Sequence, residues 1–313
     1  MRPLWRPLLR RTLALAAGAA LLGGCTAGAT PSLGGAHSSG SSASAPPGSS
    51  PAHTSHSAPK PPPDPWNPRP PSVAALGDSI TRGFDACKPL SDCPEVSWAT
   101  GTRTKVDSVT QRLTATGHSW NLAVSGALVS DLPDQARAAA VHKPALVTVL
   151  IGANDACTTD VDSMTSTADF RTDFADTLSY LHRTLPHTQI LVSSIPDLRR
   201  LWSVGRKNPL GKQIWKLGLC PSMLADADSQ SAAANSRRTA VRDRVMAYNS
   251  AMGQVCGQYT LCRYDGGAVF DYRFDSDDLS TWDWFHPNES GEAALARILS
   301  EVVRRPTPVA DRS

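Results

Sequence analysis

Hydrophobic runs and helix-like patterns alternate along most of this chain, from about residue 72 to about residue 304. The strongest strand pattern is the continuous apolar run Ala145–Ile151. Shorter runs predict four more strands, at Val73–Leu76, Asn121–Val124, Gln189–Ser193 and Ala268–Phe270. Short apolar runs between polar segments are typical of strands that are covered on both faces of a sheet.

Between these runs, apolar positions recur with the period of an α-helix. In Phe170–Thr184, the side chains Phe170, Phe174, Leu178 and Leu181 share one face. Asp131 and Pro133 predict the start of a helix that ends near His142. Similar patterns predict helices at Ser108–Thr116, Arg238–Cys256 and Glu289–Val303. This alternation favours an α/β fold, a three-layer α/β/α sandwich around a mostly parallel central sheet.

The N-terminal 70 residues have a different composition. Arginines precede the apolar stretch Thr12–Leu22, which is too short to span a bilayer comfortably, so we expect residues 1–24 to be a signal peptide. Leu22-Gly23-Gly24-Cys25 resembles a bacterial lipobox, in which Cys25 is lipidated; ordinary secretion is the alternative, and Sec and twin-arginine export both remain open.

Residues 25–70 contain mainly Ser, Pro, Gly, Ala, Thr and His and few large apolar side chains. Such a segment buries too little surface to offset the entropy of ordering it, so we expect a disordered tether behind the lipid anchor. Residues 71–305 then form one globular domain, and residues 306–313 a short tail. The expected location is the outer side of the cell membrane, or outside the cell if Cys25 is not lipidated.

Removal of the expected signal peptide changes the net charge of the chain. Four of the 31 Lys and Arg residues lie in residues 1–24, which leaves 27 against 28 Asp and Glu residues, a net charge of −1. Nothing in this balance favours nucleic acid as a partner. We expect a monomer.

Seven cysteines agree with export. Once Cys25 is set aside, the six others form an even set that predicts three disulfides: Cys87, Cys93, Cys157, Cys220, Cys256 and Cys262. Six cysteines allow fifteen connectivities. The close pairs Cys87 with Cys93 and Cys256 with Cys262 are the simplest local closures, which leaves Cys157 with Cys220. A zinc site is disfavoured because no Cys-x-x-Cys occurs.

Candidate chemistry lies where the predicted strands end, the usual place for functional residues in parallel sheets. Ser79 follows the first strand in Gly77-Asp78-Ser79, and Asn154 follows the third. Gly126 lies at the exit of the second strand. Near the C-terminus, Asp283 precedes His286 by three residues, a spacing that no other histidine of the domain has. A serine, a histidine and an aspartate can form a nucleophile, its base and an orienting carboxylate.

In this order, Ser79, Gly126, Asn154 and His286 resemble the four residues that name the SGNH/GDSL hydrolases, and the chain lacks the Gly-x-Ser-x-Gly elbow of α/β-hydrolases. The resemblance covers the whole domain and implies a flavodoxin-like fold. Further stretches look most like the phospholipase-B-like branch: Ser97-Trp98, residues 121–127, residues 131–135 and residues 151–157.

The resemblance implies a GDSL esterase or lipase that hydrolyses carboxylic esters through an acyl-enzyme on Ser79. His286 acts as the base and Asp283 orients it. The oxyanion is met by the backbone N–H groups of Ser79 and Gly126 and by the Asn154 side chain. Asp78 is assigned to the turn. No metal or organic cofactor is expected.

The substrate is less defined by the sequence. We expect either a lipid ester or a small-molecule ester of a short to medium acyl chain. A carbohydrate or cell-wall O-acetyl esterase is the alternative enzyme, and a non-catalytic binding lipoprotein on the same fold is the alternative of another class. Trp282, Trp284 and Phe285 form either an acyl pocket or core. The basic, aromatic segment Leu198–Lys216 is either a loop that contacts lipid headgroups or a solvated loop.

Overall fold

The structure, a computed structural model, describes residues 66–115 and 117–306. The expected signal peptide (1–24), Cys25 with its lipidation, nearly all of the tether (25–70) and the tail beyond residue 306 lie outside the described residues. Trp66 is buried, and its indole N–H donates to the carbonyl oxygen of Val303 at 2.8 Å. The packed domain therefore includes residues that precede the expected boundary at 71.

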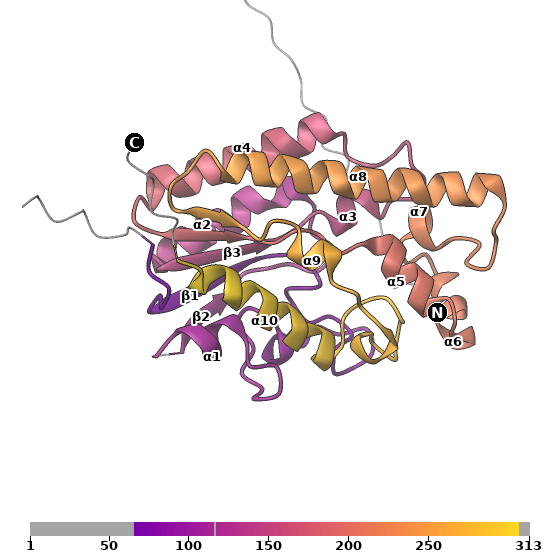
Figure 1. The fold of residues 1–313 in the computed structure, drawn as a ribbon, viewed down its shortest axis with the longest axis horizontal. Coiled ribbons are helices and arrows are strands. Elements are labelled where there is room, and N and C mark those ends of the chain that lie inside the picture. Colours follow the sequence, from indigo (N-terminus) through magenta and orange to yellow (C-terminus); the bar gives the residue numbers. More distant parts are fainter. Residues whose placement is uncertain (1–65, 116, 307–313) are drawn as a thin grey trace, which may run out of the picture. The chain divides into compact units, whose positions relative to one another are not determined.

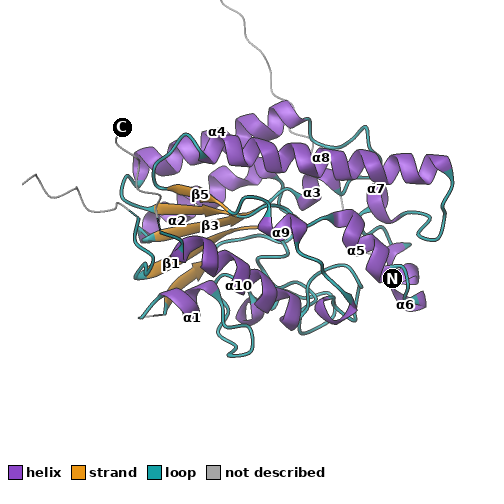
Figure 2. Cartoon of the chain, viewed as in Figure 1, coloured by secondary structure: helices purple, strands orange, loops and turns teal. Residues whose placement is uncertain are grey.

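All five strands run parallel in one sheet, in the order β2-β1-β3-β4-β5 (Figure 2). The strands are β1 Ser72–Gly77, β2 His118–Asn121, β3 Leu146–Leu150, β4 Gln189–Val192 and β5 Cys262–Tyr264. The predicted parallel α/β fold is confirmed. The chain changes direction across the sheet between β1 and β3, and such a switch point is where parallel sheets bind ligands.

Helices cover both faces of this sheet (Figure 1). One face carries α2 Leu132–His142, α4 Thr167–Thr184 and α8 Ala232–Cys256. The other carries α1 Val109–Leu113 and α10 Glu289–Arg304. The apolar stripe predicted for α4 is buried at all four positions. The expected three layers are therefore present.

Shorter helices lie in the connections. They are η1 Pro94–Val96, η2 Val129–Asp131, α3 Ala153–Ala156, α5 Leu198–Gly205, α6 Pro209–Trp215, α7 Pro221–Leu224, α9 Ala268–Asp271 and η3 Ser276–Asp278. Among the described residues, no helix combines the length and the apolar character that a membrane crossing requires.

Two of the predicted strands are wrong. The second was expected at Asn121–Val124, but β2 ends at Asn121 and the apolar residues after it form the loop that leaves the sheet. The last was expected at Ala268–Phe270, which is helix α9; the edge position belongs to Cys262–Tyr264. Both true strands lie at the edges of the sheet, where half of the surface faces polar surroundings, so an apolar run does not mark them.

Helix boundaries differ as well. The helix predicted at Ser108–Thr116 ends at Leu113, and Ser108 caps it by accepting the N–H of Gln111. Helix α8 begins six residues before Arg238, after the cap Ser231. The segment Leu198–Lys216, expected as a loop, forms α5 and α6. Side chains cap these two helices, because Asp197 and Asn208 accept the first free backbone N–H groups.

All three favoured disulfides are present: Cys87–Cys93, Cys157–Cys220 and Cys256–Cys262. The first closes a loop shortly after Ser79. The second connects the residue after α3 to the start of α7. The third connects the end of α8 to the start of β5, across a sequence separation of only six residues.

Candidate active site

Ser79, His286 and Asp283 form one hydrogen-bonded chain. Ser79 Oγ lies 2.9 Å from His286 Nε2, and His286 Nδ1 lies 2.5 Å from Asp283 Oδ2. Ser79 follows β1, and the other two residues precede α10, so 207 residues of sequence separate the serine from the histidine. All three side chains are buried or nearly so. The arrangement gives a hydroxyl, a base within reach of it, and a carboxylate that orients the base.

The turn that presents Ser79 is held from two sides. Asp78 Oδ1 accepts the backbone N–H of Ile80 at 3.0 Å, which closes a tight turn around the serine. The Gln135 side chain accepts the N–H of Gly77 at 2.8 Å and donates to the carbonyl of the same residue at 2.9 Å. The last residue of β1 is therefore fixed by helix α2, and Ser79 stands at the carboxyl end of a rigid strand.

Asp283 is anchored by its own chain. Its Oδ1 accepts the backbone N–H groups of Phe285 and His286, each at 2.9 Å, while Oδ2 faces the imidazole. Burial raises the pKa of Asp283, but the attraction of His286 and these hydrogen bonds outweigh it and hold the pKa below its ordinary value. The carboxylate therefore stays ionised.

The pKa of His286 is shifted in the opposite direction, upwards. Burial lowers the pKa of the imidazole, but the neighbouring charge of Asp283 and the hydrogen bond to it raise the pKa above the ordinary value. The edge of the Phe84 ring packs against the imidazole, with 5.2 Å between ring centroids. A histidine in this setting can take the proton of Ser79 and hold it as an imidazolium next to a carboxylate.

Asn154, in the segment after β3, contacts the residue that follows Gly126 in the segment after β2. Asn154, in α3 after β3, donates one side-chain N–H to the carbonyl of Ala127, the residue after Gly126, at 2.9 Å. A side-chain amide has two N–H groups, so the other is left for a ligand. Gly126 has φ +85° and lies exposed, in a conformation that glycine adopts without strain. Asn154 thus lies in a cavity with Ser79, and Gly126 lies one residue before its hydrogen-bond partner Ala127.

A cavity of about 200 Å³ opens onto this site. Ser79, Asn154 and His286 line it together with the Cys157–Cys220 disulfide. Most of the remaining wall is apolar and comes from Ile80, Ala153, Leu198, Leu201, Leu219 and Phe285. Gly126 is not part of this wall. The cavity therefore combines a polar, reactive end with an apolar body.

Of the three aromatic residues around Asp283, one contributes to the cavity. Phe285 is buried and lines it. Trp284 lies against α6, where a side chain at Gly211 would collide with it, and Trp282 is 46% exposed. The segment Leu198–Lys216 contributes through Leu198 and Leu201. Its tryptophans, Trp202 and Trp215, are buried in the core, so neither presents an aromatic surface to a membrane.

Three contributors were not identified from the sequence: Phe84 beside the imidazole, Gln135 under the serine turn, and Asp85, a buried acid close to Asp283 and His286. Their positions depend on contacts between distant segments, which no local pattern encodes. Among the described residues, one cluster has the spacing of metal ligands, Cys87, Cys93 and Glu95, but the two sulfurs form a disulfide.

Comparison with solved structures finds similar folds. An acetylxylan esterase from Geobacillus stearothermophilus is 15% identical over 75% of this chain and 94% of its own, with a TM-score of 0.47. A lipase/acylhydrolase from Enterococcus faecalis is 16% identical over 76% of this chain and 99% of its own, with a TM-score of 0.45. An alpha/beta hydrolase from the metagenome of Lake Arreo, Spain, is 17% identical over 75% and 96%, with a TM-score of 0.46.

No curated protein gives a significant match to the sequence. A family model does: that of the GDSL-like Lipase/Acylhydrolase family matches residues 73–299, from β1 to within α10. This range includes every residue of the proposed site. The chain therefore belongs to the GDSL-like lipase/acylhydrolase family and is a hydrolase that acts on esters.

Proposed function

We propose that this protein is an extracytoplasmic serine esterase or lipase that hydrolyses carboxylic esters of short to medium acyl chains, including lipid esters. The hydrogen-bonded chain Ser79–His286–Asp283 at the mouth of an apolar cavity carries the proposal. The stretches at residues 121–127 and 151–157 favour the phospholipase-B-like branch of the family.

In the first half of the reaction, His286 Nε2 takes the proton of Ser79 Oγ as the oxygen attacks the ester carbonyl carbon. The carbonyl oxygen becomes an oxyanion, and the N–H groups of Ser79, Gly126 and the Asn154 side chain donate to it. The intermediate collapses, His286 gives its proton to the leaving alcohol oxygen, and the acyl group stays on Ser79. In the second half, His286 takes a proton from a water molecule as the water oxygen attacks the carbonyl carbon of the acyl-enzyme. His286 then returns the proton to Ser79 Oγ as the carboxylic acid leaves.

The cavity indicates which kind of acyl group fits the site. Its wall is mostly aliphatic and aromatic, which suits a hydrocarbon chain better than a sugar, and its volume of about 200 Å³ suits a chain of modest length. Catalysis requires the complete set of Ser79, Asn154 and His286, whereas binding alone would not require it. The first observation favours the esterase or lipase over the carbohydrate O-acetyl esterase, and the second favours an enzyme over the non-catalytic lipoprotein.

A hydrolysis panel tests the proposal. Purified protein is assayed on esters from acetyl to long-chain acyl groups and on phospholipids, with Ser79→Ala as the blank. We expect turnover that peaks at short to medium chains and disappears in Ser79→Ala. Activity confined to acetyl esters would indicate the O-acetyl esterase instead. Equal turnover by Ser79→Ala would refute the catalytic assignment.

The location is part of the proposal and rests on the sequence of residues 1–25. Lipidation of Cys25 would hold the enzyme at the outer face of the cell membrane on a tether of about 45 residues. In cells, Cys25→Ser should release active enzyme from the membrane fraction. Unchanged membrane association of the variant would count against lipidation.

A further inference from the structure

The segment that follows the serine turn encloses the catalytic histidine. The backbone N–H of Phe84 donates to the carbonyl of Ser79 at 3.0 Å, and its ring packs on the imidazole. The next residue, Asp85, is only 2% exposed and has φ +58°. A non-glycine residue in this conformation costs free energy that the surrounding contacts must offset, and such residues concentrate at functional sites.

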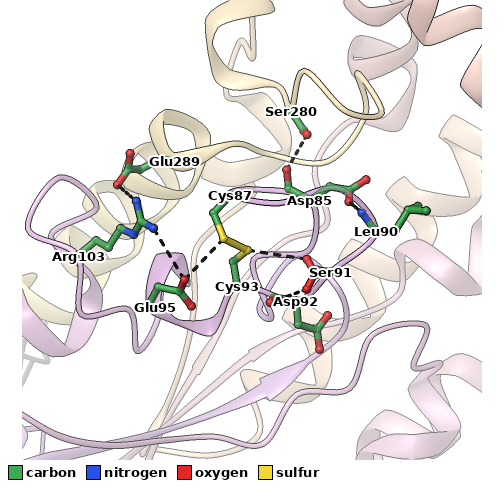
Figure 3. The surroundings of a disulfide bond; sticks show 10 residues. All are labelled: Asp85, Cys87, Leu90, Ser91, Asp92, Cys93, Glu95, Arg103, Ser280 and Glu289. Carbon is green, nitrogen blue, oxygen red and sulfur yellow. Dashed lines mark hydrogen bonds and ion pairs between the residues drawn. A yellow bond between two sulfur atoms is a disulfide. The ribbon is translucent and has the colours of Figure 1, made fainter.

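The main chain of Asp85 is bonded to the turn that carries Asp283 and His286 (Figure 3). Its carbonyl accepts the hydroxyl of Ser280 at 2.6 Å, and Ser280 in turn donates its backbone N–H to the carbonyl of His286 at 2.8 Å. Ser280 also accepts the backbone N–H of Trp284 at 2.9 Å. A movement of Asp85 would therefore move the catalytic turn with it.

The Asp85 carboxyl makes a second contact with the same turn. One oxygen accepts the backbone N–H of Leu90, and the group also lies within hydrogen-bonding reach of the Asp283 carboxyl and close to the charge of His286. Two carboxyls can share a hydrogen bond only when one carries the proton. Burial, followed by the charge of Asp283, raises the pKa of Asp85 to about 6, whereas the pKa of Asp283 is held low. Asp85 is therefore the member of the pair that holds the proton below about pH 6, and above that pH both carboxyls are ionised.

A covalent loop keeps Asp85 in place. The disulfide Cys87–Cys93 closes the segment, and the Asp85 N–H donates to Ser91 across it at 3.0 Å. Arg103 then lies between Glu95, just after the disulfide, and Glu289 at the start of α10, at 3.8 Å from each. Figure 3 shows these groups around the disulfide, with the Ser280 hydroxyl directed at Asp85.

We propose that Asp85 is a positioning residue of this active site, which anchors Asp283 and, through it, orients His286. The proposal rests on the proposed function of Ser79, His286 and Asp283. It assigns Asp85 two effects. As a neutral acid it donates to Asp283 and fixes its orientation. When it ionises, it adds a negative charge near His286, beside those of Asp283 and Asp78 that the imidazole already faces.

Two substitutions separate these effects. Asp85→Ala removes the donor and the charge, and we expect kcat to fall by about 10- to 100-fold, the loss of one hydrogen bond to a charged group, with little change in KM. Asp85→Asn keeps an acceptor for Leu90 and a donor for Asp283 but cannot ionise, so it should recover much of the lost kcat.

The pH profile is the decisive readout. Without the negative charge of Asp85, His286 should lose its proton at lower pH. The acid limb of kcat/KM of Asp85→Asn should therefore lie about half a pH unit or more below that of the wild type, as expected for the loss of a neighbouring unit charge. The matched control is Asp265→Asn. Asp265 directly follows β5, is as buried as Asp85, and accepts a hydrogen bond from the Ser194 hydroxyl. Its acid limb should stay at the wild-type position.

The imidazole itself can be titrated without turnover. NMR of His286 in Ser79→Ala, with and without Asp85→Asn, should show a lower pKa of the imidazole in the double variant. Because this measurement needs no ester hydrolysis, it stands even if the proposed function fails. An unchanged titration of His286, or an acid limb of folded Asp85→Asn that coincides with the wild type, would overturn the role of Asp85, whatever Asp85→Ala does.

Discussion

In the proposed reaction, Asn154 is a side chain prepared in advance for a charge that exists only in the transition state. The hydrogen bond from its amide to the carbonyl of Ala127 fixes the orientation of the group, so the second N–H needs no reorganisation when an oxyanion forms. Gly152, two residues earlier at the start of α3, lies in a tightly packed position: a Cβ there would lie 2.6 Å from Ile195 and 2.9 Å from Phe170. Helix α3 is therefore packed tightly against the core.

We expect Asn154→Ala to lower kcat by about 10²- to 10³-fold while KM changes little, because the lost donor acts mainly on the transition state. The measurement is steady-state kinetics on the best ester of the panel, with thermal unfolding to show that the variant is folded. A folded variant with kcat within a few-fold of the wild type would remove Asn154 from the oxyanion site.

At the same scale, the sequence predicted the residues of the proposed catalytic chain but not the residues that support them. Ser79 and His286 could be predicted because the family order of motifs places them, although 207 residues separate them. Asp85 and Gln135 could not. Asp85 acquires its role from Ser280 and Asp283, and Gln135 from Gly77, and these contacts exist only after the chain has folded.

Among the elements, burial decided what could be predicted. Strand β3 is buried at every position, and its continuous apolar run predicted it almost to the residue. The edge strands β2 and β5 are only partly buried, and because they contain polar residues they lack the apolar run by which a strand is recognised in the sequence. Helices α5 and α6 were expected as a loop because their many basic residues obscure the few apolar positions that face the core.

The disulfides give an element-scale prediction. Cys157–Cys220 spans 63 residues and ties α3 to α7, whereas Cys256–Cys262 spans six. Because loop entropy in the unfolded chain grows with loop length, the double variant Cys157→Ser/Cys220→Ser should lose about 4 kcal/mol of unfolding free energy, against about 2 kcal/mol for Cys256→Ser/Cys262→Ser. Denaturant unfolding of the two double variants makes the comparison. Equal losses, or a larger loss from the short loop, would contradict it.

At the scale of the whole molecule, buried acids near the serine turn make stability depend on pH. Burial raises the pKa of Asp78 to about 7 and that of Asp155 to about 6, and raises that of Glu292 well above its usual range. The folded state then binds more protons than the unfolded state between about pH 4 and pH 7. For these groups, stability is greatest at the acid end of that window and falls as the pH rises through it.

Asp78→Asn isolates the contribution of Asp78, whose pKa is raised to about 7. The variant cannot ionise, so its unfolding free energy should improve relative to the wild type by roughly 2 to 4 kcal/mol between pH 4.5 and pH 7.5. Urea unfolding of both proteins at the two pH values measures the change. The prediction fails if the difference in unfolding free energy between the two proteins is the same at both pH values.

The central claim is that Ser79, activated by His286, forms a covalent acyl-enzyme. The most direct measurement is intact mass and peptide mapping after reaction with a fluorophosphonate, which an activated serine attacks at phosphorus with loss of fluoride. We predict one adduct per chain, located on Ser79, that is absent in Ser79→Ala and forms far more slowly in His286→Ala. An unlabelled wild type, or an adduct on another residue, would contradict the account.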